Sequence, residues 1–122
     1  MKITIPTTDD RGLEASVSGH FGRSQFLTTL DTSTEEIHSQ AIRGHHFGGS
    51  VRPAVAAADA QPDVIICPNL GQKAVKYFHE RGIEVFIGAT GTVRDVVQTY
   101  LKGKLEHATV ANSCRGRSDC AG

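Results

Sequence analysis

The 122-residue sequence lacks several features that would point to a particular class of protein. Its 13 basic and 13 acidic residues cancel, so no overall field favours a nucleic acid or a membrane surface as partner. No apolar run approaches the roughly 18 residues of a membrane span, and the start "MKITIPTTDD" is unlike a signal peptide. Three cysteines, an odd number, argue against an extracellular disulfide scaffold. We therefore expect a cytoplasmic chain with one domain, a monomer or weak dimer.

Hydrophobic periodicity predicts three strands followed by alternating helices and strands. The short turn "DTSTEE" after the second strand requires that the second and third strands are antiparallel. The aperiodic end of the chain, 109–122, is expected to be a flexible tail outside a domain of residues 1–108. The expected strands cover 2–6, 24–31, 37–43, 64–68 and 83–89, and the expected helices cover 52–61, 71–81 and 90–104.

The last of these helices has clear start and stop signals. Thr92 is a suitable N-cap, and Gly103 lies where the helix should end. Gly82 has the same role at the end of the preceding helix. An apolar stripe of Val93, Val96, Val97 and Leu101 is expected to face the core.

The order βββαβαβα predicts an α/β fold with one five-stranded mixed sheet and helices packed on it. In this topology four loops meet at one edge of the sheet, where ligands of open α/β folds usually bind. The candidate binding residues in these loops are His20, Phe21, Gly22, Arg23, His45, His46, Gly48, Gly49, Cys67, Asn69, Gly71 and Gly91.

The chemistry of these residues favours an anionic, sulfur-rich metal species over a bare cation. Imidazole and thiolate are ligands for soft or borderline metals, and an arginine supplies fixed positive charge. Glycines let backbone N–H groups approach a ligand, and helix N-termini attract anions. A bare cation would favour carboxylates, and few are expected at this edge.

Each of these residues also has a purely structural interpretation. His20 would then hydrogen-bond within its loop, Phe21 would anchor that loop, and Cys67 would be a small core residue. In the tail, Cys114 and Cys120 are either a metal or redox pair, favoured by the neighbouring arginines, or two incidental cysteines. The convergence of the loops, rather than any one residue, supports a binding site.

At these residues the chain resembles the dinitrogenase iron–molybdenum cofactor biosynthesis family, which includes NifX, NafY and the C-terminal part of NifB. The resemblance covers residues 1–108, through "SGHFGRSQFL", "GHHFGGSVRPAV" and "GIEVFIGATGTVRDVV". It implies a ribonuclease-H-like fold and binding of a metal–sulfur cluster or its precursor, iron–sulfur or molybdenum-containing. The metal ligands would come from His20, His45 and His46, with Cys114 and Cys120 of the tail as further candidates.

The preferred hypothesis is therefore a non-catalytic carrier or chaperone that exchanges a metallocluster with donor and acceptor proteins. The alternative is a regulatory module that senses a small anion or a partner protein at the same edge. A two-metal nuclease or phosphohydrolase would need clustered carboxylates. The first strand has none, and Asp31 and Asp63 are expected at the opposite edge of the sheet.

Overall fold

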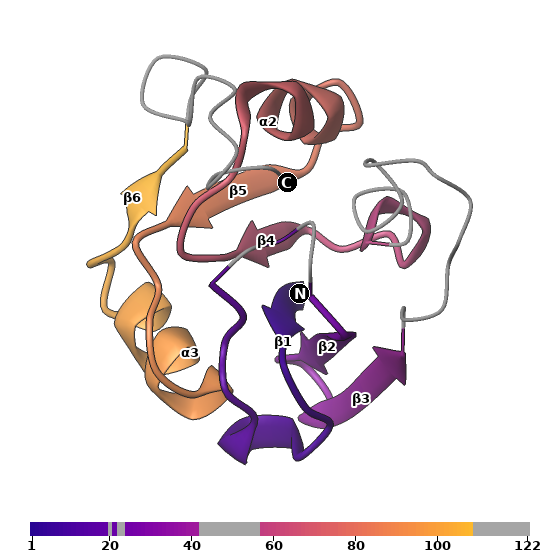
Figure 1. Ribbon diagram of the computed structural model, residues 1–122, viewed down its shortest axis with the longest axis vertical. Helices are drawn as coiled ribbons and strands as arrows, with labels where there is room; N and C mark the ends of the chain where they lie inside the picture. Colours follow the sequence, from indigo (N-terminus) through magenta and orange to yellow (C-terminus); the bar gives the residue numbers. More distant parts are fainter. Residues whose placement is uncertain (20, 22–23, 42–56, 109–122) are drawn as a thin grey trace.

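The computed structural model describes residues 1–19, 21, 24–41 and 57–108. Over these ranges the chain forms one sheet of six strands, with helices on both of its faces (Figure 1). The strands are β1 Lys2–Thr7, β2 Phe26–Asp31, β3 Glu36–Ala41, β4 Val64–Ile66, β5 Glu84–Ile87 and β6 Glu106–His107. The helices are η1 Gly12–Glu14, α2 Gln72–His79 and α3 Val93–Leu101.

The strands follow the order β3-β2-β1-β4-β5-β6. Strands β1, β4 and β5 are parallel, while β2 is antiparallel to both β1 and β3. The predicted mixed α/β sheet is confirmed, but the predicted number of five strands is wrong. The sixth strand, β6, pairs only Glu106 and His107 with β5, and so short a segment leaves no alternating pattern in the sequence.

The sheet separates two apolar cores, because successive side chains of a strand point to opposite faces. In β4, Val64 and Ile66 join the core under α3 and η1. Ile65, together with Cys67 just beyond the strand, joins the core under α2. All four are at most 2% exposed, which explains why this short strand is continuously apolar.

The predicted helix ends are confirmed by their hydrogen bonds. The backbone N–H of Asp95 donates to the Thr92 hydroxyl at 3.3 Å, and the Asp95 carboxylate accepts from the Thr92 N–H at 3.4 Å. Together these two bonds form a capping box. Gly82 and Gly103 have φ of 74° and 71°, as a left-handed helix end requires.

The predicted apolar stripe of α3 is wrong at its last member. Val93, Val96 and Val97 are buried, but the Leu101 side chain is 64% exposed. Tyr100 takes the inward position instead, and its ring packs edge-on against Phe86 with centroids 5.0 Å apart. At 3.6 residues per turn, position 101 lies about 80° around the helix from position 93, at the margin of the buried face.

Only the end of the predicted helix 52–61 falls within the described residues, where 57–59 are helical. The rest of that helix and the predicted tail 109–122 lie outside them. Within the described ranges, no helix is long and apolar enough to cross a membrane.

Candidate functional site at the carboxyl edge of the sheet

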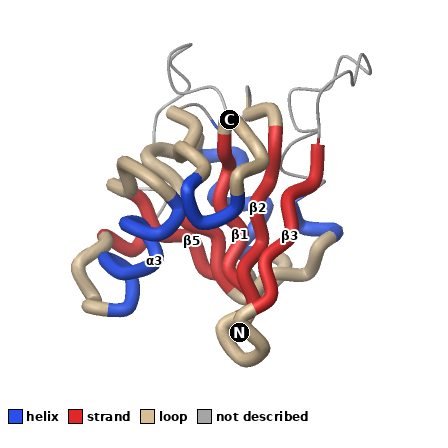
Figure 2. Tube along the Cα trace, turned by 90° about the horizontal axis from the view of Figure 1, so that it is seen from below, coloured by secondary structure: helices blue, strands red, loops and turns tan. Residues whose placement is uncertain are grey.

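The described strand ends flank the loops that the sequence predicts to converge. Thr7, at the end of β1, is paired with Phe26, which begins β2, and Phe26 is paired with Ala41, which ends β3. The parallel strands β4 and β5 end on the same side. Figure 2 shows the strands β1, β2 and β3 side by side, with the N-terminus at the opposite end. The topology that underlies the predicted site is therefore confirmed.

Most of the predicted ligands lie outside the described residues. The candidates outside the described residues are His20, Gly22, Arg23, His45, His46, Gly48, Gly49, Cys114 and Cys120. Their role as ligands stays a prediction. The remaining candidates are Phe21, Cys67, Asn69, Gly71 and Gly91, and each has a defined position.

Phe21 belongs to the core under α2. Its side chain is 1% exposed, and its ring packs edge-on against Phe78 of α2, with centroids 5.9 Å apart. The backbone N–H and the hydroxyl of Ser24 both donate to the Phe21 carbonyl oxygen, at 3.2 and 2.7 Å. These contacts favour the interpretation of Phe21 as a loop anchor. The ring is occupied by the core and does not offer a surface to a ligand.

Cys67 lies directly after β4 and is fully buried. Its N–H donates to the Phe86 carbonyl at 3.0 Å, and its own carbonyl accepts from Ala89 at 3.4 Å. Burial raises the pKa of the Cys67 thiol to about 12, because a thiolate would lose its hydration in this apolar position. The geometry favours a neutral core thiol, the structural alternative for this residue.

Among the described residues, the exposed part of this edge includes backbone and the Asn69 side chain. Asn69 is exposed, while its neighbour Leu70 is buried and holds the turn in place. Gly88 and Gly91 are also exposed, with φ of 90° and 101°. Such positive angles suit glycine and let the backbone come close to a ligand. Gly71 is half-buried and precedes the first residue of α2.

The turn before α3 is braced by the loop that follows β1. The Val17 N–H donates to the Gly91 carbonyl at 2.9 Å, and the Val93 N–H donates to the Ala15 carbonyl at 3.0 Å. A Cβ at Gly91 would lie 3.0 Å from an oxygen of Asp95. The turn is therefore fixed on both sides, which keeps its backbone in one position at the edge.

Sequence reasoning missed the residue that organises this bracing loop, Asp9. Its carboxylate accepts hydrogen bonds from the backbone N–H groups of Arg11 and Ser16, at 3.1 and 3.3 Å, and from the Arg11 side chain at 3.2 Å. The Arg11 side chain, with these N–H donors, lowers the pKa of Asp9 to about 2. The sequence did contain a signal for this role. Asp9 stands in a polar loop two residues before Arg11, whose backbone N–H it accepts, and this spacing is the pattern of an Asx turn.

The predicted position of the acidic residues is confirmed. Asp31 lies opposite Lys2 in the register of β1 and β2, at the start of β1. Asp63 accepts a hydrogen bond from the Lys2 N–H at 2.8 Å. Both carboxylates lie at the edge opposite the converging loops. Among the described residues, no group of three His, Cys, Asp or Glu side chains is arranged to hold a metal ion.

Comparisons with known proteins agree with this architecture. A family model described as dinitrogenase iron-molybdenum cofactor matches residues 1–103. An uncharacterized protein of Methanocaldococcus jannaschii, MJ0580, is 30% identical over 111 residues, which are 87% of this chain and 90% of that protein.

Two solved structures share the fold. The apo form of the orange protein from Desulfovibrio gigas has a TM-score of 0.76 and 24% identity, and the alignment covers 88% of this chain and 92% of that one. A putative NifB protein from Thermotoga has a TM-score of 0.75 and 21% identity, with coverage of 95% and 98%.

Proposed function

Since the chain belongs to the dinitrogenase iron-molybdenum cofactor family, we propose that it binds and carries a metal–sulfur cluster or cluster precursor. The cargo is iron–sulfur or molybdenum-containing. In this proposal the protein is a non-catalytic, cytoplasmic carrier that receives its cargo from a donor protein and releases it to an acceptor. A ribonuclease-H-like classification of the fold is part of the same proposal.

The observation that carries the proposal is the arrangement of chain segments at the carboxyl edge. The described ends of β1, β2 and β3 flank the two segments that contain His20, His45 and His46. The exposed backbone of Gly88 and Gly91 lies at the end of β5 on the same side. Backbone N–H groups at this edge would complement an anionic cluster, and the imidazoles would supply exchangeable ligands.

A carrier without catalysis is supported by the distribution of acidic groups. Asp31 and Asp63 lie at the opposite edge, where Asp31 is 3.8 Å from the N-terminal ammonium and Asp63 accepts a hydrogen bond from the Lys2 N–H. The most perturbed carboxylate, Asp9, is saturated by hydrogen bonds within its own loop. Hydrolysis by two metal ions would require carboxylates that converge on the ions, and the described residues offer no such group.

The orange protein and the putative NifB protein support the proposal at the level of fold. The NifB name and the family description both refer to nitrogenase cofactor proteins, which is consistent with a cluster as cargo. Binding of such a cluster by this chain is our inference from that membership and from the geometry of the edge.

The test is anaerobic reconstitution with iron, sulfide and thiomolybdate, followed by metal analysis and visible absorption. Three variants are compared with the native chain: His20→Ala/His45→Ala, Cys114→Ser/Cys120→Ser, and a matched control, His38→Ala/His79→Ala. The control removes two exposed histidines that lie on β3 and α2.

We expect stoichiometric metal in the native chain and the control, and its loss in the His20/His45 variant. Loss of metal in the Cys114/Cys120 variant alone would indicate that the cluster binds at the tail. Metal retained by all variants would mean adventitious binding. If no chain retains metal, the carrier proposal is overturned and the regulatory module becomes the better interpretation.

A further inference from the structure

Strand β3 forms one outer edge of the described sheet, and its own six residues carry few of the features that usually protect such an edge. All six residues of Glu36–Ala41 pair in register with β2, so no bulge interrupts the strand. It contains neither proline nor lysine. The edge strand on the other side, β6, has only two residues. A long, regular edge presents unpaired N–H and C=O groups to an incoming strand, so β3 is the more open edge of the described sheet.

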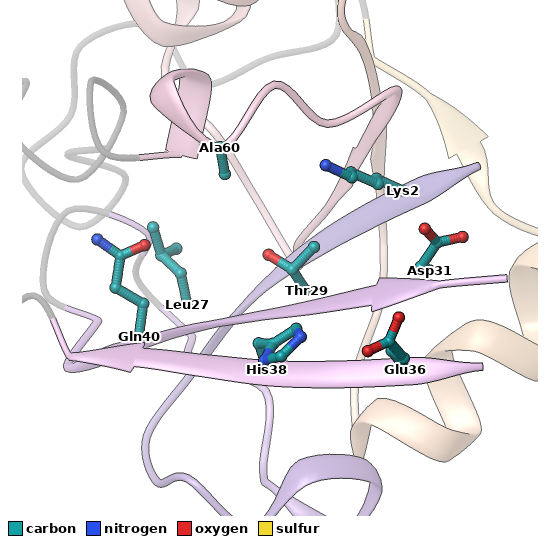
Figure 3. A pocket seen from close by; sticks show the side chains of 8 residues that line it. All are labelled: Lys2, Leu27, Thr29, Asp31, Glu36, His38, Gln40 and Ala60. Carbon is teal, nitrogen blue, oxygen red and sulfur yellow. The ribbon is translucent and has the colours of Figure 1, made fainter. Parts of the chain in front are cut away.

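A groove of about 430 Å³ lies beside this edge. Figure 3 shows that its floor is formed by β1, β2 and β3, and that three alternate side chains of β3 line it. Its lining includes Lys2, Asp31, Glu36, His38, Gln40 and Ala60. A strand added to β3 would place every second side chain at the mouth of this groove.

The charges in the groove select the kind of strand that fits. Asp31 is already engaged, because it accepts from the Ser33 N–H at 2.9 Å and lies 3.8 Å from the N-terminal ammonium. Glu36, which is paired with Asp31 across the strands, is exposed and has no ion-pair partner in the described part of the chain. Lys2 also lines the groove, but it lies two strands away and is paired with Asp31 across β1 and β2. Glu36, on the outer strand, is therefore the carboxylate of the groove that remains for an incoming cation.

A second copy of this chain would not complement that carboxylate well. The six residues of β3 are Glu, Ile, His, Ser, Gln and Ala, with no lysine or arginine among them. The strand has a single large apolar residue, Ile37, and it faces the core under η1 and α3. An antiparallel pair of β3 strands would thus join two polar edges, and the six described residues of neither strand would supply a cation for Glu36.

We propose that β3 is a docking edge for an extended segment of a partner protein, which adds to the sheet and places a lysine or arginine beside Glu36. Backbone hydrogen bonds would supply most of the affinity, and the groove would supply the preference for a basic side chain. The inference rests on the proposed function in one respect, since a carrier has to meet a donor and an acceptor. A small, polar contact suits such short-lived encounters.

The test uses the full chain without metal and monitors its backbone amides by NMR. Three capped peptides are the probes: Thr-Lys-Val-Lys-Val-Thr, its counterpart Thr-Glu-Val-Glu-Val-Thr, and the lysine peptide N-methylated at alternate residues. We expect the lysine peptide to shift the amides of β3 and β2 at millimolar concentration. The N-methylated peptide should not bind, because it cannot complete the ladder.

Two variants test the contribution of the Glu36 charge. Glu36→Gln should weaken binding of the lysine peptide by about two- to fivefold, the range of an exposed ion pair. The matched control is Glu80→Gln, an exposed glutamate that follows α2, and it should leave binding unchanged.

The proposal is overturned if the lysine peptide leaves the β3 amides unshifted, or if the glutamate peptide binds equally well. Shifts confined to another part of the chain would overturn it too. If the β3 amides shift with protein concentration alone, a second copy is the occupant and the partner proposal is wrong. Because no metal is present, failure here leaves the cluster proposal untouched, and failure of reconstitution leaves the docking edge untouched.

Discussion

The ring of Phe21 meets the ring of Phe78 edge-on, with 5.9 Å between the centroids. This contact joins the segment between β1 and β2 to the middle of the core under α2, because both side chains are buried. Phe21, which follows the predicted ligand His20 in the sequence, is thus held in the core. The contact connects the stability of the fold to the geometry of the candidate site.

The first prediction concerns Phe21 itself. Phe21→Ala should lower the free energy of unfolding by about 3–5 kcal/mol, because a buried aromatic ring is lost and a cavity remains. Urea denaturation monitored by circular dichroism measures the change. Phe21→Leu is the milder comparison and should cost clearly less. A loss below about 1 kcal/mol for the alanine variant would contradict the anchoring role.

Cys67 should be chemically inert in the folded protein. With its pKa raised to about 12 and its side chain fully buried, the thiol should resist iodoacetamide at pH 8 in a Cys114→Ser/Cys120→Ser background. Mass spectrometry measures the labelling, and addition of denaturant should restore it. Labelling of the native protein at the rate of the denatured one would contradict the burial of this side chain.

Asp9 should make stability depend on pH in the acid range. Folding lowers its pKa from the ordinary value of 3.8 to about 2, so its contribution is complete above about pH 4 and is lost as the pH falls toward 2. The side chain is 29% exposed, so we expect a contribution of about 1 kcal/mol. Urea denaturation of Asp9→Asn between pH 2 and 7 measures it.

The control for this experiment is Asp10→Asn, which changes the exposed neighbouring residue. The Asp9 variant should differ from the native chain at neutral pH and converge with it at low pH. Equal differences at all pH values would mean that the side chain acts through packing and not through its charge.

Removal of the capping box should weaken α3. Thr92→Ala should cost about 1 kcal/mol, because the first turn of the helix loses its side-chain acceptor. Thr90→Ala, two residues earlier and exposed, is the matched control and should be close to neutral. Thermal unfolding of both variants provides the measurement. A smaller effect for Thr92 than for Thr90 would contradict the role of the cap.

The sequence predicted those parts of the fold that depend on local signals. Thr92, Gly82 and Gly103 have defined roles at helix ends, and the backbone has the predicted conformation at each of them. The apolar run at 64–68 predicted a buried strand, and residues 64–67 are buried because both faces of the strand are covered. Parallel strands then determined which strand ends meet at one edge.

Features that arise from tertiary contacts were not predictable in this way. The strand β6 exists because β5 offers it an edge, and nothing in the residues Glu106 and His107 indicates a strand. The exposure of Leu101 depends on where α3 contacts the sheet. The site was predicted only as a convergence of loops, and its ligand residues stay predictions.

Ala108, which directly follows β6, is fully buried in the core under α2 and donates its N–H to the Val85 carbonyl at 2.8 Å. The family match ends at residue 103, five positions earlier. The core under α2 therefore includes a residue beyond the segment that the family model matches. A shortened chain designed on the matched region alone would leave the outer side of β5 unpaired and the core under α2 open.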